Sequence, residues 1–230
     1  MSISLTVMGD SILKGTVFQG GRYVNYREPQ DNFVKNTGLK LLNLARFGAT
    51  TLKALKLSLP ERIDKECKRR LCLIEYGSND CDFNWAEIAE KPDEEHLCFV
   101  PPEQFEENYR EIIRRVRAAG GEPLCALPVP IDSERFFKHF SSPINGQKPI
   151  LNWLGSKNLI YRWQETYAHI VAKVAKTEIV PLIDIRTPFL SVRKYMDYIG
   201  PDGIHPTKLG QRLIWETLEK IIKPFLNNQT

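Results

Sequence analysis

Apolar and polar positions follow two different patterns along the chain. Short apolar runs that suit buried strands recur at wide intervals: Leu5–Met8, Leu39–Leu44, Leu71–Ile74, Leu124–Leu127 and Ile179–Ile183. Between these runs, apolar residues return every three or four positions, which is the spacing of an amphipathic helix. The alternation predicts the α/β class, with a three-layer α/β/α sandwich around a roughly five-stranded parallel sheet.

Three of the helical segments have the clearest boundaries. One is predicted from Pro102 to a glycine pair, with glutamates early and arginines late, as the helix dipole favours. Another starts near Ser156, and its aromatic stripe, which includes Trp163, is interpreted as part of the core. The last is expected to have Pro206 in its first turn and to end before Pro224, because proline is tolerated at a helix start and disfavoured in its interior.

Three stretches lack regular periodicity: 15–36, 81–101 and 128–149. Each follows, or lies near, the end of a predicted strand. In an open parallel sheet, ligands bind beside the carboxyl ends of the strands, so these stretches are expected to be loops that wall a pocket. With 230 residues and no internal repeat or flexible linker, the chain (1–230) is predicted to fold as a single domain.

Composition and charge narrow the class of protein. Lys and Arg number 32 against 28 Asp and Glu, and the charge of +4 is spread along the chain, which favours neither nucleic acid nor a membrane as a partner. The five cysteines lack a Cys-x-x-Cys pair, which argues against a zinc site or a disulfide framework. Neither a secretion signal nor an apolar stretch of about 20 residues is recognised. A cytoplasmic protein with reduced thiols is expected.

Residues able to carry chemistry stand where strands are predicted to end. The first is Ser11 in Gly9-Asp10-Ser11, directly after the first strand, where its hydroxyl would face a pocket. A Gly-Asp-Ser tripeptide also occurs in ordinary turns, where the serine caps a helix. The segment is not the nucleophile elbow Gly-x-Ser-x-Gly, because Leu13 occupies the position of the second glycine.

Two further positions could supply hydrogen-bond donors at the same edge of the sheet. Asn79 follows the run that ends near Glu75, and its amide could stabilise a developing oxyanion; the alternative is an Asx turn. Gly48 comes after the run 39–44 and could present an unobstructed backbone N–H, and a simple turn is the other interpretation.

Near the carboxyl terminus, Asp202 and His205 lie in one short loop. Gly203 between them lets the chain fold back, so that the carboxylate can reach the imidazole. Such a pair fixes the tautomer of the histidine and stabilises its protonated form. The other histidines are interpreted as structural or solvated: His96, His139 and His169.

In chain order, Ser11, Gly48, Asn79 and His205 resemble the four blocks of the SGNH hydrolase family, also called the GDSL esterases and lipases. The resemblance spans nearly the whole chain, and the block around Gly48 matches least well. It implies the sandwich fold, Ser11 as nucleophile, His205 as base and Asp202 as the partner of that base. It also implies an oxyanion hole from the backbone N–H groups of Ser11 and Gly48 and the Asn79 side chain. It implies no metal or organic cofactor.

The substrate is less well marked, since the family includes esterases, thioesterases, lysophospholipases and carbohydrate deacetylases. Aromatic residues that suit a sugar or an acyl group occur in the stretches 81–101 and 128–149 and just after the second one. They are Phe83, Trp85, Phe99, Phe136, Phe137, Phe140 and Trp153. Polar neighbours favour a short-chain ester on a polar carrier, such as an acetylated sugar: Asn84, Glu87, Asp132 and Asn145. The expected function is carboxylic ester hydrolysis. A thioesterase or lysophospholipase, an acyltransferase and a non-catalytic binding module are the alternatives.

Overall fold

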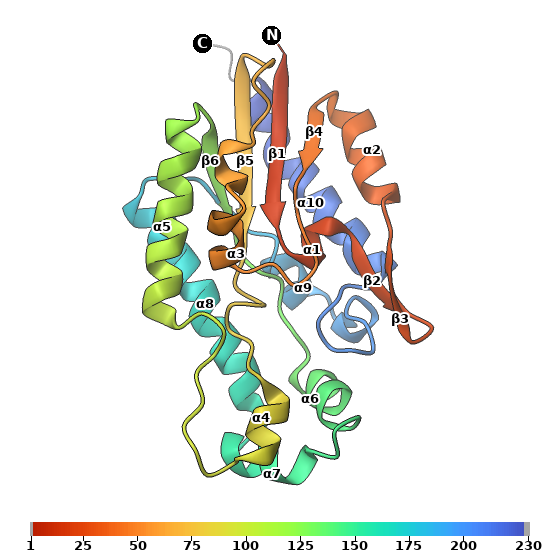
Figure 1. The fold of residues 1–230 in the computed structure, drawn as a ribbon. Coiled ribbons are helices and arrows are strands. Elements are labelled where there is room, and N and C mark those ends of the chain that lie inside the picture. The colour runs from red at the N-terminus through yellow and green to blue at the C-terminus, as the bar shows by residue number, and fades with distance from the viewer. Residues whose placement is uncertain (1, 228–230) are drawn as a thin grey trace.

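A five-stranded parallel sheet forms the centre of the computed structural model, which describes residues 2–227 (Figure 1). The strands lie in the order β4-β1-β5-β6-β7. Their bounds are β1 (Ile3–Gly9), β4 (Lys40–Asn43), β5 (Arg69–Glu75), β6 (Glu122–Ala126) and β7 (Leu182–Ile183). Each predicted apolar run overlaps one strand, and neighbouring strands pair in parallel. The predicted sandwich fold is confirmed.

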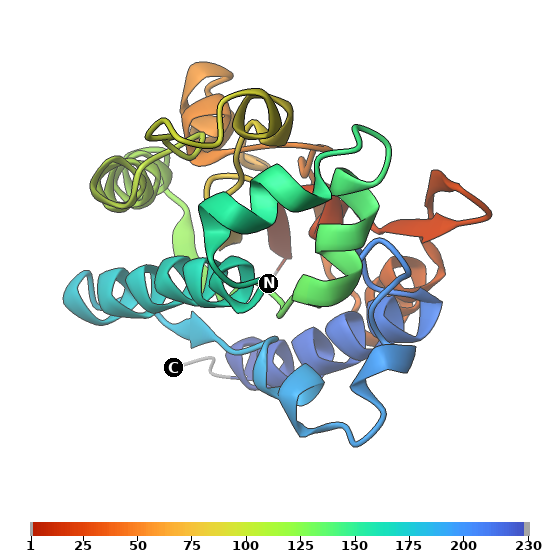
Figure 2. The same ribbon diagram turned by 90° about the horizontal axis from the view of Figure 1, so that it is seen from below.

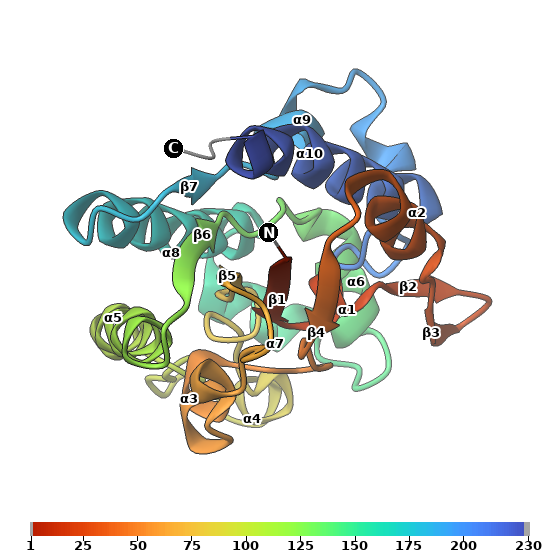
Figure 3. The same cartoon turned by 90° about the horizontal axis from the view of Figure 1, so that it is seen from above.

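Helices cover both faces of the sheet (Figure 3). One face carries α3 (Thr51–Lys56), α5 (Pro102–Ala118) and α8 (Asn158–Thr177). The opposite face carries α2 (Glu28–Thr37), α9 (Thr187–Ser191) and α10 (Lys208–Asn227). Two short 3-10 helices also occur, at Leu59–Glu61 and Tyr195–Asp197. The two helices predicted from Pro102 and from near Ser156 correspond to α5 and α8.

Alternate residues of the central strands pack into two different apolar clusters, one on each face of the sheet. Met8 of β1 and Ile74 of β5 pack with α5 and α8, whereas Val7 and Leu73 pack with α10. All four side chains are fully buried. A strand covered on both faces needs apolar residues at every position, and this is why the sequence shows continuous apolar runs here rather than alternation.

A third apolar cluster lies beyond the carboxyl ends of the strands, at the bottom of Figure 1 and toward the viewer in Figure 2. We call this region the cap. It consists of the first turns of α8 together with α4 (Trp85–Glu90), α6 (Ser133–Ser141) and α7 (Gln147–Leu154). Ile88, Phe137, Ile150 and Ile160 join these helices through their buried side chains. The cap therefore has a small core of its own next to the sheet.

The prediction that 81–101 and 128–149 are loops is wrong in part, because they contain α4, α6 and the start of α7. The two helices α4 and α6 are short, at 6 and 9 residues, so each shows too few turns for its periodicity to stand out. Each begins at a polar residue that also suits a loop: Asn84 accepts a hydrogen bond from the N–H of Glu87, and Asp132 accepts from two N–H groups of α6.

The stretch 15–36 is likewise more regular than predicted. It contains α2 and the antiparallel hairpin of β2 (Thr16–Gln19) and β3 (Arg22–Asn25). Gly20 and Gly21 form the turn with φ of 60° and 74°, values that favour glycine and that match the twist of a two-residue hairpin. The hairpin extends from the body of the molecule beside α2 (Figure 1).

The final helix begins later and ends later than predicted. Pro206 precedes α10 and pairs with Ile199 in an isolated bridge, and the Thr207 hydroxyl accepts a hydrogen bond from the N–H of Gly210 at the helix start. The helix also continues through Pro224. Only the last turn follows this proline, so one missing N–H is tolerated where the buried Ile222 already anchors the helix to the core.

Candidate active site

Ser11 is placed by the turn that joins β1 to the short helix α1 (Ser11–Lys14). Asp10 caps this helix, because its Oδ1 accepts a hydrogen bond from the N–H of Ile12 at 2.8 Å. Gly9 is required by space, since a Cβ there would lie 3.0 Å from the carbonyl oxygen of Glu75. The tight packing of β1 against β5 thus fixes where the serine leaves the sheet.

Asp202 and His205 lie in a loop that folds back on itself. The N–H of Gly200 donates to the carbonyl of His205 at 2.7 Å, and Gly203 has a φ of 78°. A Cβ at Gly203 would come 2.3 Å from the backbone nitrogen of Phe136, so only glycine fits there. The Asp202 carboxylate accepts from the N–H of His205 at 3.1 Å and contacts its ring Nδ1 at 2.6 Å.

The loop and the first strand bring three predicted residues together. Nε2 of His205 lies 2.9 Å from Oγ of Ser11, and Nδ1 of the same ring lies 2.6 Å from Oδ2 of Asp202. The exposed fractions of Ser11, Asp202 and His205 are 4%, 1% and 5%. A hydrogen-bonded chain of hydroxyl, imidazole and carboxylate, shielded from water, is an arrangement that can move a proton from the serine to the histidine.

Asn79 lies after β5, at the same edge. Its Nδ2 donates to Oδ2 of Asp10 at 2.9 Å, which leaves the second N–H of the amide for another acceptor. Sequence reasoning assigned no role to Asp10, although its position next to Ser11 was a usable signal. The carboxyl of Asp10 thus connects the start of α1 to the amide that was predicted to meet an oxyanion.

Gly48 follows β4 in a segment that runs alongside the end of β1. The N–H of Arg46 donates to the carbonyl of Gly9 at 3.0 Å, and the N–H of Ala49 closes a turn onto Arg46 at 3.2 Å. Gly48 has a φ of 62°, which favours glycine, and a Cβ there would meet nothing within 4 Å. Among residues 2–227, no backbone acceptor is recorded for the N–H of Gly48 or of Ser11.

Asp80 connects the two donor loops. Its Oδ1 accepts from the backbone N–H of Thr51 at 2.8 Å and from the Thr51 hydroxyl at 2.5 Å. The Asn108 amide of α5 donates to the same hydroxyl at 3.1 Å. Burial raises the pKa of Asp80 to about 7. The segment that carries Gly48 is therefore tied directly to the segment that carries Asn79.

Two aromatic rings cover His205. The ring of Tyr23 lies 4.9 Å from the imidazole, and the ring of Phe47 lies 5.7 Å from it and nearly parallel. The Tyr23 hydroxyl is 3.1 Å from Nε2 of His139. His139, which was interpreted as structural or solvated, makes this one contact with Tyr23. The role of Tyr23 was missed because the hairpin that carries it was predicted to be a loop.

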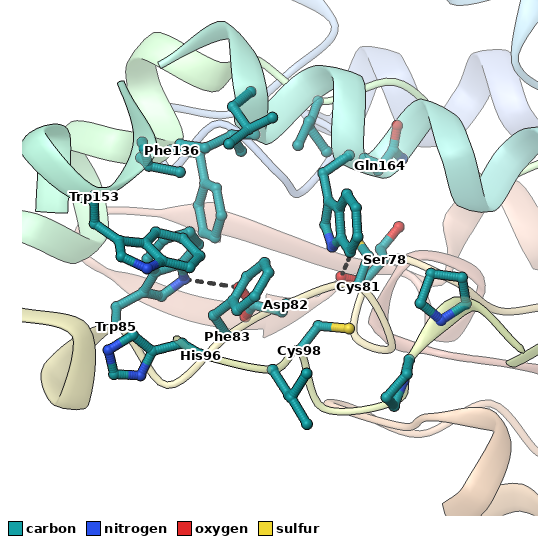
Figure 4. Close-up of a pocket in the computed structure, with 18 of the residues that line it drawn as sticks. Ser78, Cys81, Asp82, Phe83, Trp85, His96, Cys98, Phe136, Trp153 and Gln164 are labelled. Carbon is teal, nitrogen blue, oxygen red and sulfur yellow. Dashed lines mark hydrogen bonds between the residues drawn. The ribbon is translucent and has the colours of Figure 1, made fainter. Parts of the chain in front are cut away.

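We use the name rim for the polar residues gathered at the ends of the strands: Asp10, Ser11, Gly48, Asn79, Asp202 and His205. A cavity of about 470 Å³ lies beside the rim (Figure 4). Its lining includes Ser78 and Ile204, the chain neighbours of Asn79 and His205. The lining of the cavity contains none of the rim residues themselves, so the cavity adjoins the rim through these two chain neighbours.

Five aromatic side chains in or next to the cap line the cavity: Phe83, Trp85, Phe136, Trp153 and Trp163. Apolar residues such as Ile131 and Ile160 line it as well. Trp163, which was interpreted as part of the core, packs against the core cluster of α5 and α8 and also lines the cavity. His96 also lines the cavity and packs edge-on against Trp153. The main polar group among these walls, Asp82, accepts a hydrogen bond from the Trp85 ring, so the aromatic surface is left for a ligand.

A parallel sheet covered by helices on both faces, with polar residues gathered at the carboxyl ends of its strands, defines the class of open-sheet α/β proteins that bind ligands at that edge. The chain belongs to the GDSL-like lipase/acylhydrolase family, whose family model matches residues 7–213. This family acts on ester bonds, and the predicted resemblance is confirmed.

Individual relatives share this family. The chain is 26% identical over 193 residues to thioesterase 1/protease 1/lysophospholipase L1 of Escherichia coli K12, a match that spans 83% of this chain and 70% of that protein. It is 21% identical over 221 residues to the spore germination lipase LipC of Bacillus licheniformis, which covers 95% of each chain.

Solved structures share the fold at lower identity. A lipase/acylhydrolase from Enterococcus faecalis superposes with a TM-score of 0.68 at 17% identity, over 98% of this chain and 97% of that one. An acetylxylan esterase from Geobacillus stearothermophilus, Axe2, superposes with a TM-score of 0.62 at 15% identity, over 95% and 93%. The structural neighbours therefore include proteins named for quite different esters.

Proposed function

We propose that the chain is a serine esterase in which Ser11, His205 and Asp202 act as a catalytic triad. The observation that supports this proposal most directly is the pair of contacts made by the imidazole, 2.9 Å to the Ser11 hydroxyl and 2.6 Å to the Asp202 carboxylate. Filled catalytic positions also argue against the alternative of a binding module without turnover.

In the proposed reaction, Oγ of Ser11 attacks the carbonyl carbon of an ester while its proton passes to Nε2 of His205. The C–O bond to the leaving group then breaks, and His205 returns the proton to that oxygen. Water, activated by the same imidazole, releases the acid from the acyl-enzyme. Asp202 holds the ring and stabilises its positive charge throughout. No metal or organic cofactor takes part in these steps.

The oxyanion would be stabilised by three donors: the backbone N–H groups of Ser11 and Gly48, and the free N–H of the Asn79 amide. The proposal is supported by the lack of a recorded acceptor for the two backbone groups among residues 2–227. Donors that are already in place stabilise charge that appears only in the transition state, so they raise the rate more than they raise substrate affinity.

For the acyl group, the cavity supports an apolar chain. A volume of about 470 Å³ with aromatic walls far exceeds what one methyl group can fill. Two of the four polar residues that favoured an acetylated sugar are engaged elsewhere, since Asn84 and Asp132 cap helices. We therefore favour a medium-chain ester or thioester. The Escherichia coli relative is named for thioesterase and lysophospholipase activities, which also act on acyl groups.

A short-chain ester on a sugar is the second candidate, because the rings of Tyr23 and Phe47 are 42% and 45% exposed beside His205. Such rings can stack on a sugar at the leaving-group side. The two candidates differ in which half of the ester is recognised. They can be separated by varying one half at a time.

The experiment compares the native chain, Ser11→Ala and Ser191→Ala on p-nitrophenyl esters of two to twelve carbons, acetylated xylose and acyl-thiols. Ser11→Ala is expected to lose at least about 1,000-fold in kcat, and the exposed Ser191 serves as the control. For the native chain, kcat/KM is expected to rise with chain length by up to about fourfold per methylene until the cavity is filled.

Equal activity of the native chain and Ser11→Ala would contradict the proposed mechanism. A preference for acetylated xylose over every longer ester would favour the second candidate. Partitioning of the acyl group to an added alcohol in place of water would identify an acyltransferase.

The cytoplasmic location stays a prediction. The five cysteines are free and buried, which agrees with a reducing compartment. Within residues 2–227, no helix has both the length and the apolar character needed to cross a bilayer.

A further inference from the structure

Two fully buried carboxyl groups lie at the base of the candidate active site: Asp10, which belongs to the rim, and Glu75, the last residue of β5. The register of β1 and β5 pairs Gly9 with Glu75, and a Cβ at Gly9 would come 3.2 Å from Oε2 of Glu75. The Glu75 carboxyl therefore occupies the space under the turn that carries Asp10 and Ser11. Both Asp10 and Glu75 have exposed fractions of 0%.

The structure around these carboxyls offers hydrogen-bond donors to one of them. Asp10 accepts from the N–H of Ile12 at 2.8 Å and from the Asn79 amide at 2.9 Å. For Glu75, neither oxygen has a hydrogen-bond partner recorded among residues 2–227. Across the same residues, no lysine or arginine forms an ion pair with either carboxyl. The backbone N–H of Asp10 lies near enough to Glu75 to act on its pKa in the lowering direction, but burial outweighs it. A buried carboxylate without a counter-ion is strongly destabilised, whereas a protonated carboxyl can itself donate.

We propose that Glu75 is a positioning residue that remains protonated at neutral pH and donates its O–H to the carboxylate of Asp10. The pair then carries one negative charge. That charge orients one N–H of Asn79 toward Asp10 and leaves the other for the oxyanion. The inference rests on the proposed function, since it assigns Asn79 to the oxyanion hole.

The electrostatics of the pair agree with this assignment. Burial, followed by the charge of Asp10, raises the pKa of Glu75 well above its usual range. Burial also raises the pKa of Asp10 to about 6, while contact with Glu75 and Asn79 acts in the lowering direction. Ionisable groups on the surrounding elements also face the pair: Tyr76, Asp80, Tyr109 and His205. Arg46 acts on the neighbouring Tyr76.

Loss of the Glu75 proton would harm catalysis in two ways. The Asp10 carboxylate would lose the O–H of Glu75 as a hydrogen-bond donor and would be repelled by the new negative charge on Glu75. This repulsion would shift the Asn79 amide, which is hydrogen-bonded to Asp10. A second negative charge would also lie beneath the place where the oxyanion develops. The native kcat is therefore expected to fall at alkaline pH as Glu75 ionises, with KM nearly constant.

Two substitutions at Glu75 distinguish the effect of its proton from the effect of its side-chain shape. Glu75→Gln retains an N–H donor that cannot ionise, so kcat at neutral pH should stay within about threefold of native and the alkaline decline should vanish. Glu75→Met fills similar space without a donor and should lower kcat by about tenfold or more. Thr6→Val, which alters an unpartnered buried hydroxyl of β1, should leave the pH profile unchanged.

Stability provides a readout that does not depend on activity. Because the folded pKa of Glu75 exceeds the ordinary value of 4.5, its contribution to folding is complete below that pH and is lost as the pH rises to the folded pKa. The Tm of Glu75→Gln, measured relative to native, should therefore increase with pH above about 4.5. Infrared difference spectra should show a protonated carboxyl band that Glu75→Gln lacks.

A constant Tm difference across that pH range, or absence of the band, would overturn the proposal. An equal loss of kcat in Glu75→Gln and Glu75→Met would also do so. If Ser11→Ala kept full activity, the proposed function would fail, while the Tm and infrared results would still report the protonation of Glu75.

Discussion

The rim and the cap are neighbouring regions built on opposite principles. The rim is polar, and its positions are fixed by hydrogen bonds such as the 2.9 Å contact between Ser11 and His205 and the 2.9 Å contact between Asp10 and Asn79. The cap is apolar, and its helices are held by packed side chains such as Phe137. The difference teaches that the reaction and the choice of substrate are encoded in separate parts of this chain. Changes in the rim should act on kcat, and changes in the cap should act on chain-length preference.

The largest effect in this comparison is expected at Asn79. Asn79→Ala removes one oxyanion donor and the partner of Asp10, so kcat should fall by about 100- to 1,000-fold while KM stays within about twofold. Asn152→Ala, on the exposed side of α7, is the matched control. Steady-state kinetics on esters of two and eight carbons provide the measurement. A change in the ratio between the two esters, without loss of kcat, would break the division between rim and cap.

An intermediate effect is expected at Phe83 in the cavity wall, where its ring contacts those of Trp85, Trp153 and Trp163. Phe83→Ala should lower kcat/KM for an eight-carbon ester by about tenfold and change that for an acetyl ester less than about twofold, because only the longer chain needs this apolar surface. Phe99→Ala is the control, since that ring is 56% exposed and lies outside the cavity lining. Equal losses on both esters would show that the cap acts on the reaction itself.

The smallest effect is expected at Tyr23, which covers His205 and belongs to neither region. Tyr23→Phe removes the hydroxyl that contacts His139 but retains the ring, so kcat/KM should change by less than about threefold. Tyr23→Ala should have a larger effect on esters with bulky alcohols, because the ring then no longer covers the imidazole. Comparing phenyl and ethyl esters of one acid measures this. Identical behaviour of the two variants would contradict a role for the ring in binding the leaving group.

The rim was largely predictable from the sequence, and the reason is geometric. Carboxyl ends of parallel strands meet at one edge, so Ser11 and Asn79 could be placed together once their strands were recognised. Asp202 and His205 are three residues apart in one loop, so their contact could be predicted from the local sequence. The triad assignment itself stays a proposal until the variants are measured.

The cap could not be predicted, because the same polar residue signals either a loop or a helix start. Asn84 and Asp132 were interpreted as pocket polarity, yet they cap short helices. Trp163 shows a second limit: an apolar stripe on a helix has the same period whether it faces a core or a cavity. The proximity of Asp10 and Glu75 depends on the register between β1 and β5. The sequence of either strand alone does not reveal that register. The glutamate that directly follows the apolar run 71–74 of β5 was the available signal.

Gly203 marks the point where the two regions meet. Its carbonyl accepts from the N–H of Asp132 at 2.8 Å, and a Cβ there would overlap the backbone of α6. Replacing α6 with a helix from another protein, in order to alter the acyl preference, would therefore also displace the loop that carries His205. Swaps that keep residues 131–137 and vary only the outer helices α4 and α7 are the ones that should exchange specificity without slowing the enzyme.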